Sequence, residues 1–342
     1  PAAAEFKHGL AIDEAGVFIG QGSVVSTTTG DLSIDGVSSS YDGVTIRTSD
    51  VYTASGDIGI AGRGGSGAGF SLDVDSSIDG GDGLVTVRAG NDGTSDAVRI
   101  SGSISSNLGV NLRPLDTADA ILLGYGAGFA LDAGDLALID SPELVIGSAQ
   151  HAGAILVQQA VTRDGNLTLQ NNGGAGGIDI QAALDVGDGT LALSSGGSIT
   201  QASAGVISAH SLLAQAGGDV LLAAALNDVA NTTLAGSAGG DFEFQDANTL
   251  AIGSVSAIGF DASSGQLSSF AGTGITAGGD AFVRNLQGDL TLNAGVTATN
   301  IDLVTAGRLQ NVAGASLVAS GDWRVWASTW EGETRGGLAG DG

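Results

Sequence analysis

The chain has 342 residues with a net charge of −26, and it contains 59 Gly, three Pro, no Cys and no Met. The absence of Cys excludes disulfides, thiolate metal sites and cysteine nucleophiles. Only 11 basic residues stand against 37 acidic ones, so the chain lacks the basic surface that binds nucleic acid or anionic membranes, and divalent cations are the charged partners that its composition favours.

One short phrase recurs along the chain: a Gly, often followed by Asp or Asn, and then a strand in which apolar residues alternate. The first copy is Gly30-Asp31-Leu32-Ser33-Ile34. The next four copies follow at intervals of 26, 27, 26 and 25 residues and begin at Gly56, Gly83, Gly109 and Gly134. Later copies are less regular and begin at Gly165, Gly189, Gly218, Gly240, Gly288 and Gly321.

The alternation within each copy predicts a short strand with one buried face. In the copy at Gly165, Leu167 and Leu169 are expected to face the core, whereas Thr168 and Gln170 face the solvent. The Gly-Asp pair before the strand tolerates positive φ and offers a side chain that bonds the turn backbone. Helical periodicity is nearly absent, apart from one helical turn expected at 223–229.

Two to three short strands in each repeat of roughly 20–27 residues correspond to one coil of a right-handed parallel β-helix. We therefore predict one continuous β-solenoid over residues 1–342, with roughly 13–17 coils about 4.8 Å apart and a length on the order of 60–80 Å. Short strands and turns also occur in antiparallel sandwiches and barrels. The near-constant spacing of the phrases and the lack of clear hairpin pairs favour the β-helix.

Three stretches resemble a known family. In residues 135–147 an acidic-Leu strand ends at an acidic-x-x-Leu turn and the next strand closes with Ile-Gly, and residues 196–201 read Gly-Gly-Ser-Ile-Thr-Gln. The stretch from Trp323 to Ser328 is similar to segments that end a repetitive region. These features resemble the repeat modules of filamentous-haemagglutinin-like exoproteins, which are large bacterial adhesins, and the likeness is best over residues 84–342.

The resemblance implies export through an outer-membrane secretion partner, of the two-partner or autotransporter type, and a location at the bacterial cell surface. It also implies a role in adhesion, in biofilm formation or in the display of a distal effector. Zero Met, even at position 1, predicts a processed or excised piece of a longer protein. No apolar run approaches the about 18 residues that a transmembrane helix needs, so no membrane insertion is expected.

Asp73, Asp75 and Asp79 are the candidate metal ligands, for calcium. They begin a loop with oxygen ligands at alternate positions, as in part of a calcium-binding loop. However, its Gly comes two positions late, and Leu84 stands where such a loop has Glu. The alternative is an ordinary strand in which Val74 points inward and the aspartates face the solvent.

A polysaccharide lyase or glycosidase is the enzymatic alternative for a β-helix. A lyase needs basic residues, but Lys7 is the single Lys and the ten Arg are scattered. A glycosidase needs two carboxylates at a fixed separation, and the chain lacks long loops that would build a cleft. His8, His151 and His210 show no metal-ligand spacing and are expected in turns or at the surface. We therefore predict no catalysis and no cofactor, with calcium as the exception to be tested.

Asn166-Leu167-Thr168 and Asn231-Thr232-Thr233 fit the acceptor pattern for N-linked glycans. In a bacterial chain such matches commonly arise by chance. Asn166 and Asn231 are therefore weak candidates for glycosylation.

All three tryptophans, Trp323, Trp326 and Trp330, lie near the end of the sequence. A solenoid end exposes its core and its strand edges, so residues 321–342 are predicted to form an aromatic cap or exit segment. Stacking on a glycan is the alternative role for these side chains.

Three functions remain open from the sequence. The first is a secreted surface rod, an adhesin stalk that meets a glycan or protein of a host or neighbouring cell. The second is a subunit that self-associates end to end into an extracellular filament or sheath. The third is the polysaccharide-active enzyme.

Overall fold

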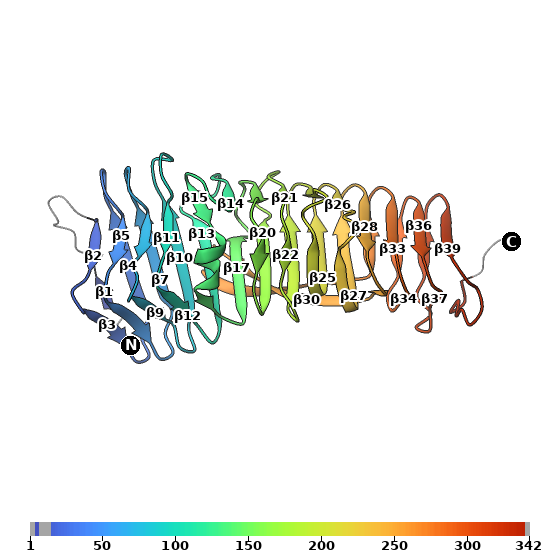
Figure 1. Cartoon of the computed structure of the whole chain (residues 1–342), viewed down its shortest axis with the longest axis horizontal. Coiled ribbons are helices and arrows are strands. Elements are labelled where there is room, and N and C mark those ends of the chain that lie inside the picture. Colours follow the sequence, from blue (N-terminus) through green and yellow to red (C-terminus); the bar gives the residue numbers. More distant parts are fainter. Residues whose placement is uncertain (1–3, 7–14, 339–342) are drawn as a thin grey trace.

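The protein is a rod of stacked coils. The computed structural model describes the backbone of residues 4–6 and 15–338 and the side chains of residues 15–229 and 233–338. This part of the chain forms a parallel β-solenoid of about 13 turns that is 2% helical, and its coils follow one another along the rod in sequence order (Figure 1). The predicted fold class is confirmed, with the number of coils at the lower end of the predicted range.

Equivalent strands of successive coils pair in parallel, and they form four parallel sheets in the described part of the rod. The longest is an 18-stranded sheet in two columns, joined by the long strands β25 (Ile207–Ala216) and β27 (Asp228–Ala238). Its first column consists of β1 (Ala4–Phe6), β4 (Leu32–Val37), β7 (Ile58–Arg63), β10 (Leu84–Gly90), β13 (Gly109–Pro114), β17 (Glu143–Ser148), β20 (Asn166–Asn171), β23 (Thr190–Ser195), β32 (Ile275–Ala277), β35 (Val296–Ala298) and β38 (Leu317–Ala319). Its second column consists of β19 (Val161–Thr162), β22 (Leu184–Asp185), β29 (Leu250–Ile252), β34 (Leu290–Leu292) and β37 (Leu309–Gln310).

The three other parallel sheets complete the coils. The N-terminal coils carry a sheet of β2 (Val17–Ile19), β5 (Val44–Ile46), β8 (Phe70–Leu72) and β11 (Val98–Ile100), and a sheet of β3 (Val24–Thr27), β6 (Asp50–Thr53), β9 (Ser77–Asp79), β12 (Ser103–Ser105) and β16 (Ile139–Asp140). The later coils carry a sheet of β14 (Ile121–Leu123), β15 (Phe129–Leu131), β18 (Ile155–Val157), β21 (Ile178–Ile180), β24 (Ile199–Gln201), β26 (Val220–Leu222), β28 (Phe242–Asp246), β33 (Ala281–Asn285), β36 (Ile301–Thr305) and β39 (Trp323–Ala327).

Inward-facing aliphatic residues of successive coils form ladders along the core. One ladder in the 18-stranded sheet runs in register through Leu32, Ile58, Val85, Val110, Leu144, Leu167, Leu191, Leu212 and Leu234. None of these side chains is more than 2% exposed, and burying each contributes about 1.5–3 kcal/mol. Because every coil buries these residues against its neighbours, the stability of the rod accrues between coils.

The aspartate of the Gly-Asp phrase connects neighbouring coils. Asp31 Oδ1 accepts the backbone N–H of Asp57 at 2.9 Å, and Asp57 Oδ1 accepts that of Leu84 at 2.9 Å. Asp219 and Asp241 repeat this contact at 2.9 Å in a later part of the rod. The side chain therefore bonds the turn backbone as predicted, but the turn belongs to the following coil.

The phrases do not all fall on one face of the rod. The copies from Gly30 to Gly109 lead into strands of the 18-stranded sheet, whereas those at Gly218 and Gly240 lead into β26 and β28 of the 10-stranded sheet. The copy at Gly288 again leads into the 18-stranded sheet, through β34, so the phrase falls on different faces of the rod in different coils.

One copy of the phrase is a helix instead of the predicted strand. The copy at Gly134 lies in α1 (Ala133–Ala137), where Asp132 Oδ1 accepts the N–H groups of Gly134 and Asp135. Asp135 Oδ2 in turn accepts the N–H of Asp132 at 2.9 Å. This capping box satisfies N–H groups that a strand would direct to its neighbour. The helical turn expected at 223–229 is wrong, because these residues form a turn and the start of β27.

One antiparallel hairpin interrupts the parallel pattern of the described strands. It consists of β30 (Ser254–Asp261) and β31 (Gln266–Thr273), which pair along their full length. The prediction that the chain has no hairpin pairs is wrong at this position. Residues 254–273, called the strap below, leave the coil and run along the rod across the strands of earlier coils (Figure 1). Because they form no coil, they lower the number of turns.

Candidate functional site

The strap docks on the outward face of the 18-stranded sheet through side chains of the sheet. Thr168 Oγ1 donates to the carbonyl oxygen of Ile258 at 2.7 Å, and Gln170 Oε1 accepts the N–H of Phe260 at 2.9 Å. Thr168 is 2% and Gln170 is 6% exposed. The prediction that this face of the strand meets solvent is therefore wrong, since the strap covers it.

Apolar contacts fix the strap along its length. The ring of Phe260 is fully buried and packs against Leu84 and Val145, which project from the outward face of the sheet. A second cluster comprises Ala192, Leu213, Ala235, Val255, Ala257 and the partly buried Phe270. Outward-facing apolar residues such as Val145 and Leu213 are the signal in the sequence that could have revealed the cover.

A groove with a volume of about 380 Å³ lies where the turn of the strap overhangs the sheet. Gly59, Thr86, Arg88 and Arg113 of the sheet line one side, and the turn residues 262–265 line the other. At the tip of the strap, Gln266 Nε2 donates to Asp57 Oδ2 at 3.2 Å. The expectation that the chain lacks a long segment able to build a cleft is therefore wrong.

Two arginines stand side by side in this groove. Arg88 on β10 and Arg113 on β13 are directly opposite each other in the parallel register. The Cζ atom of Arg113 lies 4.9 Å from the centroid of the Phe260 ring, and its Nε donates to Asn111 Oδ1 at 3.0 Å. Burial, together with the positive charge of Arg88, lowers the pKa of Arg113 to about 10, so the Arg113 side chain remains cationic at neutral pH.

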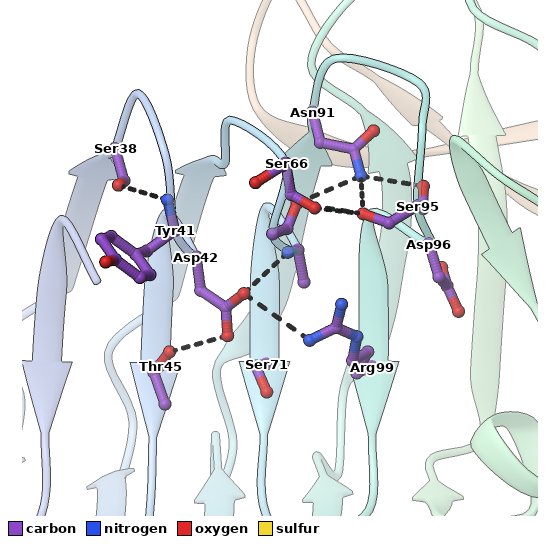
Figure 2. Close-up of polar contacts among 12 residues, drawn as sticks. Ser38, Tyr41, Asp42, Thr45, Ser66, Ser71, Asn91, Ser95, Asp96 and Arg99 are labelled. Carbon is purple, nitrogen blue, oxygen red and sulfur yellow. Dashed lines mark hydrogen bonds and ion pairs between the residues drawn. The ribbon is translucent and has the colours of Figure 1, made fainter. Parts of the chain in front are cut away.

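A second polar cluster lies on the turns of the N-terminal coils (Figure 2). Asp42 Oδ1 accepts the N–H of Ala68 at 2.7 Å and lies 3.6 Å from Arg99, while its Oδ2 accepts the hydroxyl of Thr45 at 3.2 Å. Burial raises the pKa of the nearby Asp96 to about 6. The Asp42 contacts join three successive coils, so they hold the turns together.

The structure does not gather the three aspartates predicted to bind calcium. Asp73 forms an ion pair with Arg47, Asp75 lies in a turn with a φ of 61°, and Asp79 lies in β9. Within residues 15–338 no group of three or more His, Cys, Asp or Glu side chains could hold a metal ion. The predicted inward orientation of Val74 is wrong, because β8 ends before it and its side chain is 65% exposed.

The three tryptophans lie near the C-terminal end of the described rod. Trp323 in β39 is partly buried and packs against the core together with Val325 and Leu338. Trp326 is 58% and Trp330 is 80% exposed. A cavity of about 300 Å³ lies between Trp323 and Trp330. Only Trp323 is thus placed to cover core residues, while the ring of Trp330 is available for other contacts.

The side-chain amide of Asn166 forms hydrogen bonds to the coils on either side of it. Its Nδ2 donates to Glu143 Oε1 at 2.7 Å, and its Oδ1 accepts the N–H of Thr190 at 2.8 Å. Because this contact uses one of the two N–H bonds on Nδ2, a glycan could be attached only in place of the other. Asn231 lies in β27, but its side chain is outside the described ones.

The histidines are placed apart from one another. His151 is 1% exposed, its Nε2 has no hydrogen-bond partner, and burial lowers its pKa to about 4. His151 lies in a turn, which is one of the two positions expected for it, because its backbone N–H donates to the carbonyl oxygen of Ser148 at 3.1 Å. Its side chain is buried, whereas His210 is exposed in β25. His8 lies outside the described residues.

The chain matches no protein-family model, no curated protein and no solved structure. None of the helices in the described part of the chain is long and apolar enough to cross a membrane.

Proposed function

We propose that the protein is a secreted structural and adhesive rod, a surface stalk of the filamentous-haemagglutinin type, located at the bacterial cell surface. In this role it holds a contact site or a further domain away from the cell and meets a glycan or protein of a host or neighbouring cell. The proposal includes export by an outer-membrane secretion partner.

The observation that carries the proposal is the continuity of the core ladder from Leu32 to Leu234. A solenoid of about 13 turns with coils about 4.8 Å apart has a length on the order of 60 Å. A rod of this kind resists bending because each coil is fixed to the next by parallel backbone pairing and by the buried ladder.

The acidic surface supports the same role. Its net charge of −26 makes copies of the rod repel one another and keeps them soluble at high density. The resemblance of residues 135–147 and 196–201 to exoprotein modules supports the proposed location at the cell surface.

Negative-stain electron microscopy of the purified chain at high concentration tests the shape and the assembly. Single rods on the order of 60 Å long are expected. Regular fibres would instead support the alternative of a filament subunit that self-associates end to end, and globules would refute both.

Protease treatment of intact source bacteria tests the location. An antibody against the rod should label untreated cells, and labelling should fall after the treatment. Antigen that is protected until the cells are lysed would refute the proposed surface location.

Adhesion is tested with beads that carry the purified rod. Binding of these beads to host or neighbouring cells above the level of albumin-coated beads is expected. Equal binding of both kinds of bead would refute the adhesive part and leave the purely structural rod.

A further inference from the structure

We propose that the groove beneath the strap binds a carboxylate, carried by a hydroxylated ligand of about the size of one monosaccharide, through the Arg88 and Arg113 pair. This assignment goes beyond the proposed rod and does not depend on it.

Two like charges lie side by side in the groove. Arg88 and Arg113 are directly opposite each other on neighbouring strands, and equal charges in that position destabilise a sheet. The chain has 37 acidic residues, yet no ion pair of the described residues involves either arginine. A bound anion would relieve this repulsion, because a carboxylate placed between two guanidinium groups attracts both.

Asp57, the acidic residue that lines the groove, already has hydrogen-bond partners for both of its carboxylate oxygens. Asp57 Oδ1 accepts the N–H of Leu84 at 2.9 Å, and its Oδ2 accepts Gln266 Nε2 at 3.2 Å. Asp57 therefore fastens the tip of the strap to the sheet. On the other side of Arg88, the residue opposite it on β7 is Ala61, which carries no charge.

Arg113 is held in position before any ligand binds. Its Nε is bonded to Asn111 Oδ1, and its guanidinium lies on the ring of Phe260. Asn111 is fully buried and donates through Nδ2 to the carbonyl oxygens of Val145 and Gly147 at 3.0 and 2.9 Å. Such preorganisation lowers the entropy cost of binding, and the fork of an arginine matches the geometry of a carboxylate.

The remaining walls specify the body of the ligand. Thr86, Ser263 and Ser264 bring hydroxyl groups to the groove, which suits a ligand that carries hydroxyl groups of its own. Gly59 leaves space on the sheet side, since a Cβ placed there would meet only the carbonyl oxygen of Leu32, at 3.9 Å. A volume of about 380 Å³ is at the lower end of small-molecule pockets. The net charge of −26 favours a monoanion over a polyanion, because long-range repulsion grows with the charge of the ligand.

The test is calorimetric titration of the whole chain with sodium D-glucuronate at low ionic strength. D-glucose, which has the same ring without the carboxylate, is the neutral probe, and inorganic phosphate is the second anion. Glucuronate is expected to bind with an affinity that falls as salt is added, while glucose is expected to give no heat.

The decisive variant is Arg88→Gln. It should raise the dissociation constant for glucuronate at least about tenfold, since one charge-assisted contact is lost. Without ligand its melting temperature should be equal to or higher than that of the parent, because the like-charge pair is removed. Arg284→Gln is the matched control. It removes an exposed arginine of β33 on another sheet, and it should leave the affinity unchanged.

Gly59→Leu is a second and independent variant that fills the groove and keeps both arginines. It should abolish binding without unfolding the rod. The assignment is overturned if neither anion binds, if glucose binds as well as glucuronate, or if Arg88→Gln and Arg284→Gln behave alike. Tighter binding of phosphate than of glucuronate would overturn the carboxylate as the ligand.

Discussion

Replacing Phe260 with Ala tests whether the strap is docked independently of the coils. The Phe260 ring is fully buried between the strap and the sheet, and such a truncation costs about 3–5 kcal/mol. Loss of the Arg113 contact at 4.9 Å removes roughly 1 kcal/mol more. Because Phe260 is absent from the interior ladder, this free energy is lost from docking and not from coil stacking.

A loss of about 4 kcal/mol multiplies the population of undocked straps roughly 1000-fold, since every 1.4 kcal/mol is about tenfold. Hydrogen exchange read by mass spectrometry is the assay. Peptides from residues 254–273 should exchange much faster in Phe260→Ala, while the core strands keep their protection, because local opening and global unfolding have separate free energies. Phe282→Ala is the matched control, as Phe282 is partly exposed on β33, away from the strap.

One outcome would refute this reasoning. If Phe260→Ala lowered the melting temperature of the whole rod by many degrees while the strap peptides kept their slow exchange, the ring would belong to the cooperative core. The strap would then be an integral part of the solenoid.

Further predictions concern pH and the tryptophans. Burial lowers the pKa of His151 from 6.5 to about 4, so the unfolded chain binds this proton at a higher pH than the folded chain does. Stability should therefore fall as pH drops from about 6.5 to about 4. In thermal melts His151→Gln should reduce this loss of stability, and an unchanged pH profile would contradict the assignment. Burial raises the pKa of Asp246 from 3.8 to about 6, so its stabilising contribution is complete below about 3.8 and is lost as pH rises through about 6. Asp246→Asn should flatten the profile over that range, and an equally steep profile would count against the assignment. Trp323→Ala should lower the melting temperature, whereas Trp330→Ala, at a side chain 80% exposed, should change it little; the reverse order would show that Trp330 supplies the cap.

The repeating phrase was sufficient to predict the solenoid because its physical cause is local. Alternation of apolar residues over three to five positions fixes which side of a short strand is buried. Because successive repeats have similar lengths, equivalent strands of neighbouring coils stack on one another. Copies such as Gly30 and Gly165 are indeed followed by β4 and β20. The same pattern failed at Gly134, where the capping side chains of Asp132 and Asp135 stabilise a helix instead.

The strap and its groove could not be derived in this way. The pairing of β30 with β31 is local, but the surface on which they dock comes from coils up to 209 residues away, as the contact between Asp57 and Gln266 shows. The interval between the phrases at Gly240 and Gly288 could have indicated an insertion. It could not have indicated where the insertion lies.

The sequence by itself thus determined the parallel solenoid and its core ladders, because period and spacing act between residues close in the chain or one repeat apart. Only the tertiary structure decided that Thr168 and Gln170 are buried on the outward face and that Arg88 and Arg113 share one groove. Those features depend on a hairpin that folds back over earlier coils, and the place where it docks leaves no periodic trace in the sequence.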